Sequence, residues 1–422
     1  MNKRSFLKTI GNYSLVPFII PTEAINYVSL NESLPKKLSN EKLWKEIRSH
    51  YKLKPDYINL ESGYYNIIPK PILENFIKHV KMVNYEGSYY MRNNLIKNKD
   101  RVTERLGSIF GSNKDELCIT RNTTESLDLI IGGFPWKKND EAIFAEQDYG
   151  AMKSMFEQIS SRYGVNNKIV SIPNHPKSDE EIVKIYESEI TPKTKLIMVC
   201  HMINITGQIL PIKKICEMAH SYGVDVMVDG AHCVGHFNFK ISDFNCDYYG
   251  SSLHKWLATP LGAGLLHVKK NKISKIWPLL GDSNINPNDI KRLNHTGTHP
   301  VHTDLAINNS IDYLEWIGIE RKEKRLRFIK NYWVNRLKSI KNIVINTPFE
   351  EHRSCGIGNI GVKNLTPEKL AKLLMEKYKI FTVAIDYANV KGCRISPNVF
   401  TNIAELDRFV HSMVSISKGN IS

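Results

Sequence analysis

Several common features are missing from this chain of 422 residues, and they exclude some classes of protein. The seven cysteines form no C-x-x-C pair, which argues against a zinc ribbon. Their odd number and scattered positions do not indicate a disulfide framework either. We interpret them as reduced thiols of a protein that folds in the cytoplasm. No internal repeat is visible.

The sequence also lacks any stretch in which arginines are interleaved with aromatic residues, as a nucleic-acid groove requires. The chain is basic, with 58 Lys and Arg against 43 Asp and Glu. These basic residues are spread over segments such as 36–54, 269–275 and 321–330, which is typical of solvated faces. We therefore expect no nucleic-acid partner. The hydrophobic content of 42% and charged content of 24% are those of an ordinary folded protein.

The N-terminal apolar segment is too short and too interrupted to span a bilayer, so no stable membrane insertion is expected. The order KRSFLK (3–8) resembles a twin-arginine export signal with lysine in the first basic position. We expect residues 1–25 to be this signal and the protein to be periplasmic. The alternative is an ordinary N-terminus on a cytoplasmic protein.

Apolar strands alternate with helical segments along the middle of the chain. The expected strands are 117–120, 141–146, 167–173, 194–201, 224–230 and 246–252, and the expected helices between them are 123–131, 151–164 and 212–223. This alternation predicts an α/β fold with a mostly parallel sheet covered on both faces. Beyond about residue 300 the pattern changes to long helices (304–340) and short strands (342–346, 357–363 and 380–385). We expect an N-terminal helix and connector over 26–60, a large domain over 61–300 and a smaller α+β domain over 301–422.

Ligands of open α/β sheets bind outside the carboxyl ends of the strands. Polar residues follow five of the predicted strands and converge in principle on one crevice; they are Asn122 to Glu125, Tyr149, Asn204, Asp229, and Ser252 with His254 and Lys255.

Lys255 lies in SSLHKWLATPLGAGLL (251–266), among apolar and small residues where a charged amine is costly to bury. A lysine that can lose its charge in such a place suits Schiff-base formation with an aldehyde. A cofactor aldehyde held in this way needs an acid opposite its pyridine nitrogen. Asp229, at the end of a neighbouring strand, is placed for that role.

The phosphate of such a cofactor would bind well at a helix N-terminus. RNTTES (121–126) provides one, with Asn122 as the N-cap, Glu125 three residues later, and Thr123 and Thr124 in the first turn. Ser252 and His254 lie close enough to Lys255 in the sequence to add phosphate contacts.

Together, TRNTTESL, VDGAHCVGHF, DYYGSSLHKWLATPLGAGLL and CRISPNVFT resemble the class-V aminotransferases, a family of fold-type I pyridoxal-phosphate (PLP) enzymes. The resemblance covers about residues 40–415 and is nearest to the isopenicillin N epimerase-like branch, which is related to cysteine desulfurases. It implies a large domain with a seven-stranded sheet and an aminotransferase or epimerase that acts on the α-carbon of a small amino-acid substrate through a Lys255 Schiff base.

The resemblance also implies a role for each site residue. Lys255 would hold the cofactor and move protons, Asp229 would pair with the pyridinium, and His232 and Asn204 would lie near the phenolic oxygen. Tyr149 would stack on the ring, and Arg394 would bind the substrate α-carboxylate. The phosphate would be held by Thr123, Thr124, Ser252 and His254, and by Thr298 of a neighbouring subunit, which implies a homodimer whose active site is shared.

Two alternatives remain open. A desulfurase needs a mobile cysteine on the loop before the substrate arginine, but the expected loop IDYANVKG (385–392) has none. Cys393 is expected in a strand, and only Cys355, further upstream, keeps desulfurase or lyase chemistry open. The other alternative is a non-catalytic binding protein with the same fold. Four residues are weaker candidates for the side-chain pocket: Tyr64, Tyr65, Tyr90 and Arg92.

Two further patterns resemble sites but lack their context. GIGNIG (356–361) matches a dinucleotide-binding pattern without the preceding strand and following helix, so we interpret it as a loop leading into a strand. HCVGH (232–236) has two histidines four residues apart, but cysteine stands where a metalloprotease needs glutamate. No metal site is expected.

Overall fold

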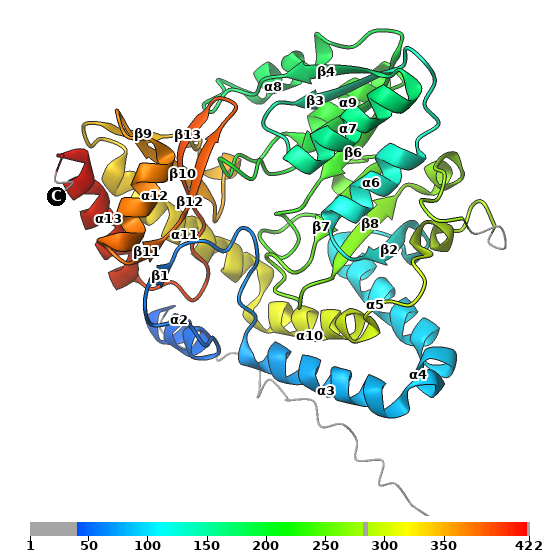
Figure 1. Ribbon diagram of the computed structural model, residues 1–422, viewed down its shortest axis with the longest axis horizontal. Helices are drawn as coiled ribbons and strands as arrows, with labels where there is room; N and C mark the ends of the chain where they lie inside the picture. Colours follow the sequence, from blue (N-terminus) through cyan, green and yellow to red (C-terminus); the bar gives the residue numbers. More distant parts are fainter. Residues whose placement is uncertain (1–39, 282–285, 420–422) are drawn as a thin grey trace, which may run out of the picture.

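The computed structural model describes residues 40–281 and 286–419 (Figure 1). The predicted export signal in residues 1–25 lies outside these ranges. Within them, no helix combines the length and the apolar character needed to cross a membrane.

A seven-stranded sheet forms the centre of the larger part of the molecule, with the strand order β2-β8-β7-β6-β5-β3-β4. The strands are β2 (Leu117–Thr120), β3 (Glu141–Ala145), β4 (Asn166–Val170), β5 (Thr194–Cys200), β6 (Asp225–Asp229), β7 (Tyr248–Ser252) and β8 (Gly264–Val268). Only β8 runs antiparallel to its neighbours in this sheet, and the other pairs are parallel. The predicted α/β class and mostly parallel sheet are therefore confirmed. The strand β8 was not predicted from the sequence.

Helices cover both faces of this sheet (Figure 1). They include α5 (Leu95–Phe110), α6 (Thr123–Gly133), α7 (Gly150–Tyr163), α8 (Asp179–Glu187) and α9 (Ile212–Ser221). Successive strand residues point to opposite faces, so Val226 and Val228 join a core with α5, α8 and α9, while Met227 joins one with α6 and α7. Burial on both faces explains why these strands are continuous apolar runs.

The C-terminal part contains an antiparallel four-stranded sheet with the order β12-β13-β10-β9. Its strands are β9 (Ile343–Ile345), β10 (Gly358–Val362), β12 (Val383–Tyr387) and β13 (Val390–Ile395), and its helices are α11 (Ile319–Leu337), α12 (Pro367–Glu376) and α13 (Ile403–Ser417). The expected loop at 385–392 is wrong: β12 and β13 form a hairpin joined by a tight turn in which Ala388 has a φ of +52°. GIGNIG leads into β10, as expected.

The N-terminal described residues contact the C-terminal part. They comprise α2 (Asn40–Ser49), β1 (Ile58–Asn59), α3 (Lys70–Glu86) and α4 (Ser88–Asn93). β1 pairs in parallel with β11 (Ile380–Phe381), and Glu61 forms an isolated bridge with Ser396. α3 packs against α10 (Val301–Ile317), and both lie along the lower edge of Figure 1. The segment after β1 is thereby brought to the place where the two sheets approach each other.

Candidate active site

One cavity of about 300 Å³ lies at the carboxyl ends of the central strands, as the topology predicts. Ten of the eleven predicted site residues line it: Thr123, Thr124, Tyr149, Asn204, Asp229, His232, Ser252, His254, Lys255 and Arg394. The exception is Thr298, which is exposed in the segment between residues 290–294 and α10. In the sequence, up to 271 positions separate these ten residues, from Thr123 at the start of α6 to Arg394 near the end of β13.

Lys255 follows β7 and is the central amine of the cavity. Burial is the main cause that lowers the pKa of its ammonium group, Arg394 lowers it too, Asp229 and Glu61 raise it, and the resulting pKa is about 8. Its Nζ lies 3.1 Å from Nε2 of His232. A large fraction of this lysine is therefore uncharged near pH 8, which is the form that acts as a nucleophile or base.

Asp229 is the last residue of β6 and is almost fully buried. Its Oδ1 accepts a hydrogen bond of 2.9 Å from the backbone N–H of Ala231. Its Oδ2 has a weak 4.0 Å contact with the thiol of Cys200, which also lines the cavity. Burial raises the pKa of Asp229, while the Ala231 N–H and Lys255 lower it. A cationic N–H donor in the cavity would give Oδ2 of Asp229 a strong hydrogen-bond partner.

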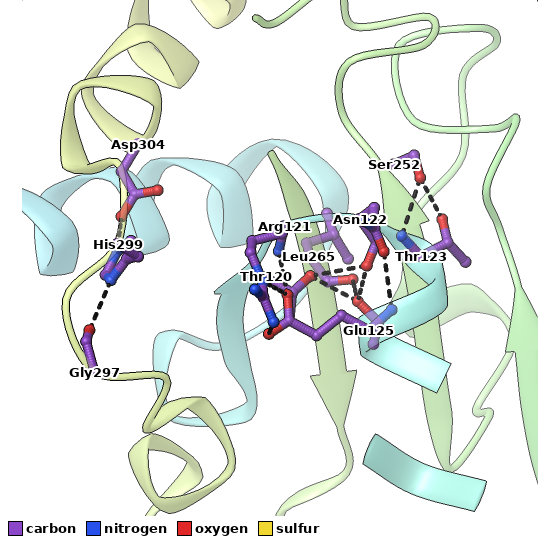
Figure 2. A network of polar contacts seen from close by, with 11 residues as sticks. Thr120, Arg121, Asn122, Thr123, Glu125, Ser252, Leu265, Gly297, His299 and Asp304 are labelled. Carbon is purple, nitrogen blue, oxygen red and sulfur yellow. Dashed lines mark hydrogen bonds and ion pairs between the residues drawn. The ribbon is translucent and has the colours of Figure 1, made fainter. Parts of the chain in front are cut away.

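The first turn of α6 and the end of β7 form a cluster of hydroxyl groups (Figure 2). Ser252 Oγ accepts a 3.0 Å hydrogen bond from the Thr123 N–H and lies 2.7 Å from Thr123 Oγ1. Asn122 caps the helix by accepting from the Glu125 N–H at 2.9 Å. Arg121 forms an ion pair with Glu125. The negative charge of this carboxylate is therefore neutralised, and the carboxylate is directed at Arg121 and not at the hydroxyls. The positive end of the helix dipole and these hydroxyls suit an anion.

Arg394 reaches the cavity from β13 and pairs with Glu61, a residue that the sequence analysis did not select. Nη2 and Nε of Arg394 lie 2.6 and 3.0 Å from Oε1 and Oε2 of Glu61. Gly63 lies against the guanidinium so closely that a Cβ there would be 2.9 Å from Cζ. No motif marked Glu61, and only the ESG sequence after a short strand could have drawn attention to this turn.

The aromatic candidates separate into two groups. Tyr149, at the N-cap of α7, and Tyr64 line the cavity and are largely exposed. Tyr65 and Arg92 do not line it, and neither does Tyr90, which is buried in α4 and accepts a hydrogen bond from Asn98.

The cysteines that bear on desulfurase chemistry are buried. Cys355 and Cys393 lie outside the residues that line the cavity, and burial raises the pKa of each thiol to about 12. Cys200 does line the cavity, but burial and nearby carboxylates raise its pKa well above the ordinary value. Among residues 40–281 and 286–419, no group of His, Cys, Asp and Glu side chains is arranged to hold a metal ion.

Comparisons with known proteins found similar sequences over most of the chain. The family model for class-V aminotransferases matches residues 69–409. Isopenicillin N epimerases of Streptomyces clavuligerus and Amycolatopsis lactamdurans are each 24% identical to the chain, over 89% of it and over 98% and 99% of their own lengths. A cysteine desulfurase of Wigglesworthia glossinidia brevipalpis is 25% identical over 89% of this chain and 97% of its own.

Solved structures share the fold at lower sequence identity. An apo cysteine desulfurase from Thermococcus onnurineus NA1 superposes with a TM-score of 0.78 at 18% identity, covering 89% of this chain and 98% of that one. A mutant of C-DES with glycine covalently linked to its PLP cofactor has a TM-score of 0.77 at 18% identity, covering 87% and 98%.

Proposed function

The chain belongs to the class-V aminotransferase family, and from this premise we propose that it is a PLP enzyme acting at the α-carbon of an amino acid. The observation that carries the proposal is the convergence of Lys255, Asp229 and Arg394 on one cavity. These three side chains are an amine, a buried carboxylate and a guanidinium, and each matches a different part of a cofactor-bound amino acid.

Enzymes of this family use pyridoxal 5′-phosphate, and the residues of this cavity fit that group. When bound, it supplies an aldehyde that condenses with amines and a ring that accepts the electron pair of a broken bond at the α-carbon. Asp229 Oδ2 would hold the protonated ring nitrogen, and the hydroxyls of Thr123, Thr124 and Ser252 would hold the phosphate. His254 Nδ1 is buried beside them without a hydrogen-bond partner in the described part of the chain, which leaves it available for the same anion.

The side chains around this group divide the remaining work. Lys255, in its uncharged form, takes the proton from the substrate α-carbon and returns it. Arg394 orients the substrate α-carboxylate, since its planar guanidinium suits that anion. Tyr149 would cover one face of the ring, and His232 and Asn204 would lie toward its phenolic oxygen. Fixing the substrate by its carboxylate aligns the α-C–H bond with the base.

We propose transamination or epimerisation as the reaction, in preference to desulfuration. Sulfur transfer to the enzyme needs a reactive thiolate, and the high pKa values of buried Cys355 and Cys393 oppose thiolate formation. The match to isopenicillin N epimerases over nearly their whole length supports transamination or epimerisation. Similar matches to cysteine desulfurases keep desulfurase or lyase chemistry as the second candidate.

A panel of L- and D-amino acids mixed with the PLP-loaded protein tests the proposal. Solvent deuterium should exchange into the α-position of at least one amino acid, with a keto acid or a racemised product forming. Alanine and sulfane sulfur from cysteine would assign the protein to the desulfurases, and sulfide with pyruvate and ammonia from cysteine would assign it to the lyases. A colourless protein that retains no PLP from PLP-fed cells would support a non-catalytic binding protein.

We also propose that the active form is a homodimer and that the protein is exported. In the dimer, Thr298 would reach the phosphate site of the partner subunit, so Thr298→Ala should weaken cofactor retention without changing the oligomeric mass. For export, the mature N-terminus should begin near residue 25. A monomeric active species or an intact Met1 in the periplasmic fraction would contradict the respective proposal.

A further inference from the structure

Trp256, the residue after Lys255, is held rigidly although it does not line the cavity. Its side chain is fully buried, and its indole stacks on His236 with ring centroids 3.7 Å apart and planes 18° from parallel. His236 is itself fixed, because it accepts from the Gly356 N–H at 2.8 Å and its Nδ1 lies 2.8 Å from the carbonyl oxygen of His232. The carbonyl oxygen of Trp256 accepts a hydrogen bond from the buried Lys322 Nζ.

The indole N–H of Trp256 fixes which nitrogen of His232 carries hydrogen. Trp256 Nε1 lies 3.3 Å from His232 Nδ1, and an indole N–H can only donate. His232 Nδ1 must therefore present its lone pair. Burial holds the pKa of His232 well below its ordinary value, so the ring is neutral and its single hydrogen is on Nε2.

This tautomer constrains Lys255. His232 Nε2 lies 3.1 Å from Lys255 Nζ, so its hydrogen is directed at the amine. An uncharged amine has a lone pair to accept that hydrogen bond, whereas an ammonium group has only donors. Protonation of Lys255 would place a hydrogen of Nζ against the hydrogen of His232 Nε2, and the hydrogen bond between them would be lost.

We propose that Trp256 is a positioning residue that keeps Lys255 uncharged and ready to capture the cofactor aldehyde, by fixing the hydrogen of His232 on Nε2. This inference rests on the proposed function only in taking Lys255 as the cofactor-binding amine. The hydrogen bond from His232 then lowers the pKa of Lys255 in addition to burial, and the sequence motif around Lys255 does not reveal it.

The charged and titratable groups facing Lys255 come from several elements and act in both directions. Asp229 at the end of β6, Glu61 after β1 and Cys200 at the end of β5 favour the ammonium form, and Arg394 of β13 disfavours it. His232 is faced by Arg394, His236 and His254, all of which oppose its protonation. The two nearby carboxylates favour a charged lysine. The hydrogen bond from His232 Nε2 opposes them, because it favours the neutral amine.

The test compares Trp256→Phe, which keeps an aromatic ring but removes the N–H donor, with Trp333→Phe. Trp333 is also fully buried, and its Nε1 has no hydrogen-bond partner within the described residues, so it is a matched control. The full-length chain, freed of cofactor, is mixed with PLP over a range of pH, and the rate of uptake at Lys255 is followed by absorbance. Lys255→Ala gives the background.

The uptake rate of the wild type should rise with a midpoint near pH 8, the pKa of Lys255. Trp333→Phe should keep that midpoint, and Trp256→Phe should raise it by about one pH unit, the effect of one lost hydrogen bond. In a His232→Ala background, removing the Trp256 N–H should no longer move the midpoint. An unchanged midpoint in a folded Trp256→Phe protein would overturn the proposal.

A second measurement needs no Trp256 variant. The ¹⁵N chemical shifts of His232 in the wild-type chain, assigned by difference from His232→Ala, report the tautomer directly. Hydrogen on Nε2 is expected, and hydrogen on Nδ1 would overturn the inference. If the tautomer is as expected but no PLP reaches Lys255, the proposed function fails while the Trp256–His232 relation stands.

Discussion

Arg394 and Glu61 form a two-point ion pair in which the carboxylate occupies the Nε and Nη2 edge of the guanidinium. Both side chains are almost fully buried. Glu61 also accepts hydrogen bonds from the N–H groups of Gly63 and Tyr64, at 2.8 and 2.9 Å, and from Ser396 Oγ. Nη1 donates a long hydrogen bond of 3.4 Å to the carbonyl oxygen of Asn204, another residue that lines the cavity. Glu61 therefore holds the arginine by its Nε and Nη2 edge, and a substrate carboxylate would bind at the second hydrogen of Nη1.

Arg394→Ala should weaken binding of α-amino acids by about 10- to 100-fold, because a charge-assisted hydrogen bond to a carboxylate is lost. The cofactor should stay bound, since its proposed contacts lie on other elements. Spectral titration of the PLP-loaded variant with amino acids measures both quantities. Unchanged amino-acid affinity would remove the carboxylate assignment from Arg394.

Glu61→Gln should raise the KM for amino acids about 5- to 10-fold with a smaller effect on kcat, because the guanidinium loses its charged anchor. The variant keeps the size of the side chain, so Gly63 and Tyr64 retain an oxygen acceptor. Steady-state kinetics with the best substrate of the panel provides the check. A lower KM would mean that Glu61 competes with the substrate for Arg394.

Ser252→Ala should increase the rate of PLP loss about 10-fold, because a hydroxyl beside the N-terminus of α6 is removed from the anion site. Ser251→Ala is a suitable control on the same strand. Ser251 Oγ donates to the Gly230 carbonyl at 2.7 Å and does not line the cavity. Cofactor loss on dialysis distinguishes the two. Equal loss from both variants would point to a general weakening of β7.

Lys322→Met should stabilise the fold at neutral pH. Burial lowers the pKa of Lys322 from 10.5 to about 7, so between these values the unfolded chain binds a proton that the folded chain does not. The burial penalty is fully present below about pH 7, on the order of a few kcal/mol, and disappears as pH approaches 10.5. The stability gained by Lys322→Met should therefore decrease as the pH rises from about 7 to 10.5.

Urea unfolding at several pH values measures that gain, and Lys324→Met, at an exposed position of α11, provides the control. We expect little change from the control at any pH. A stability gain for Lys322→Met that is independent of pH would show that better packing, and not relief of a buried charge, is responsible.

The sequence predicted the elements whose pattern is local. Strands such as Asp225–Asp229 are buried on both faces, so their apolar runs identify them without further context. The cofactor-side residues follow these strands directly, and topology alone brings Thr123, Asp229 and Lys255 to one edge.

Contacts between distant segments could not be predicted in the same way. Glu61 meets Arg394 only because β1 pairs with β11 of the C-terminal part. The hairpin of β12 and β13 was hidden because Asp386, Asn389 and Gly392 are turn-forming residue types, and β8 because it begins at a glycine. Trp256 gave no signal, since a tryptophan beside an active-site lysine is also an ordinary core residue.

The central claim is a covalent bond between Lys255 Nζ and the aldehyde carbon of PLP. The most direct measurement is borohydride reduction of the PLP-saturated protein, followed by proteolysis and mass spectrometry. We predict one pyridoxyl-labelled peptide, containing Lys255, and its absence from Lys255→Ala. A saturated protein that carries no label on Lys255, or carries it on another lysine, would contradict the account.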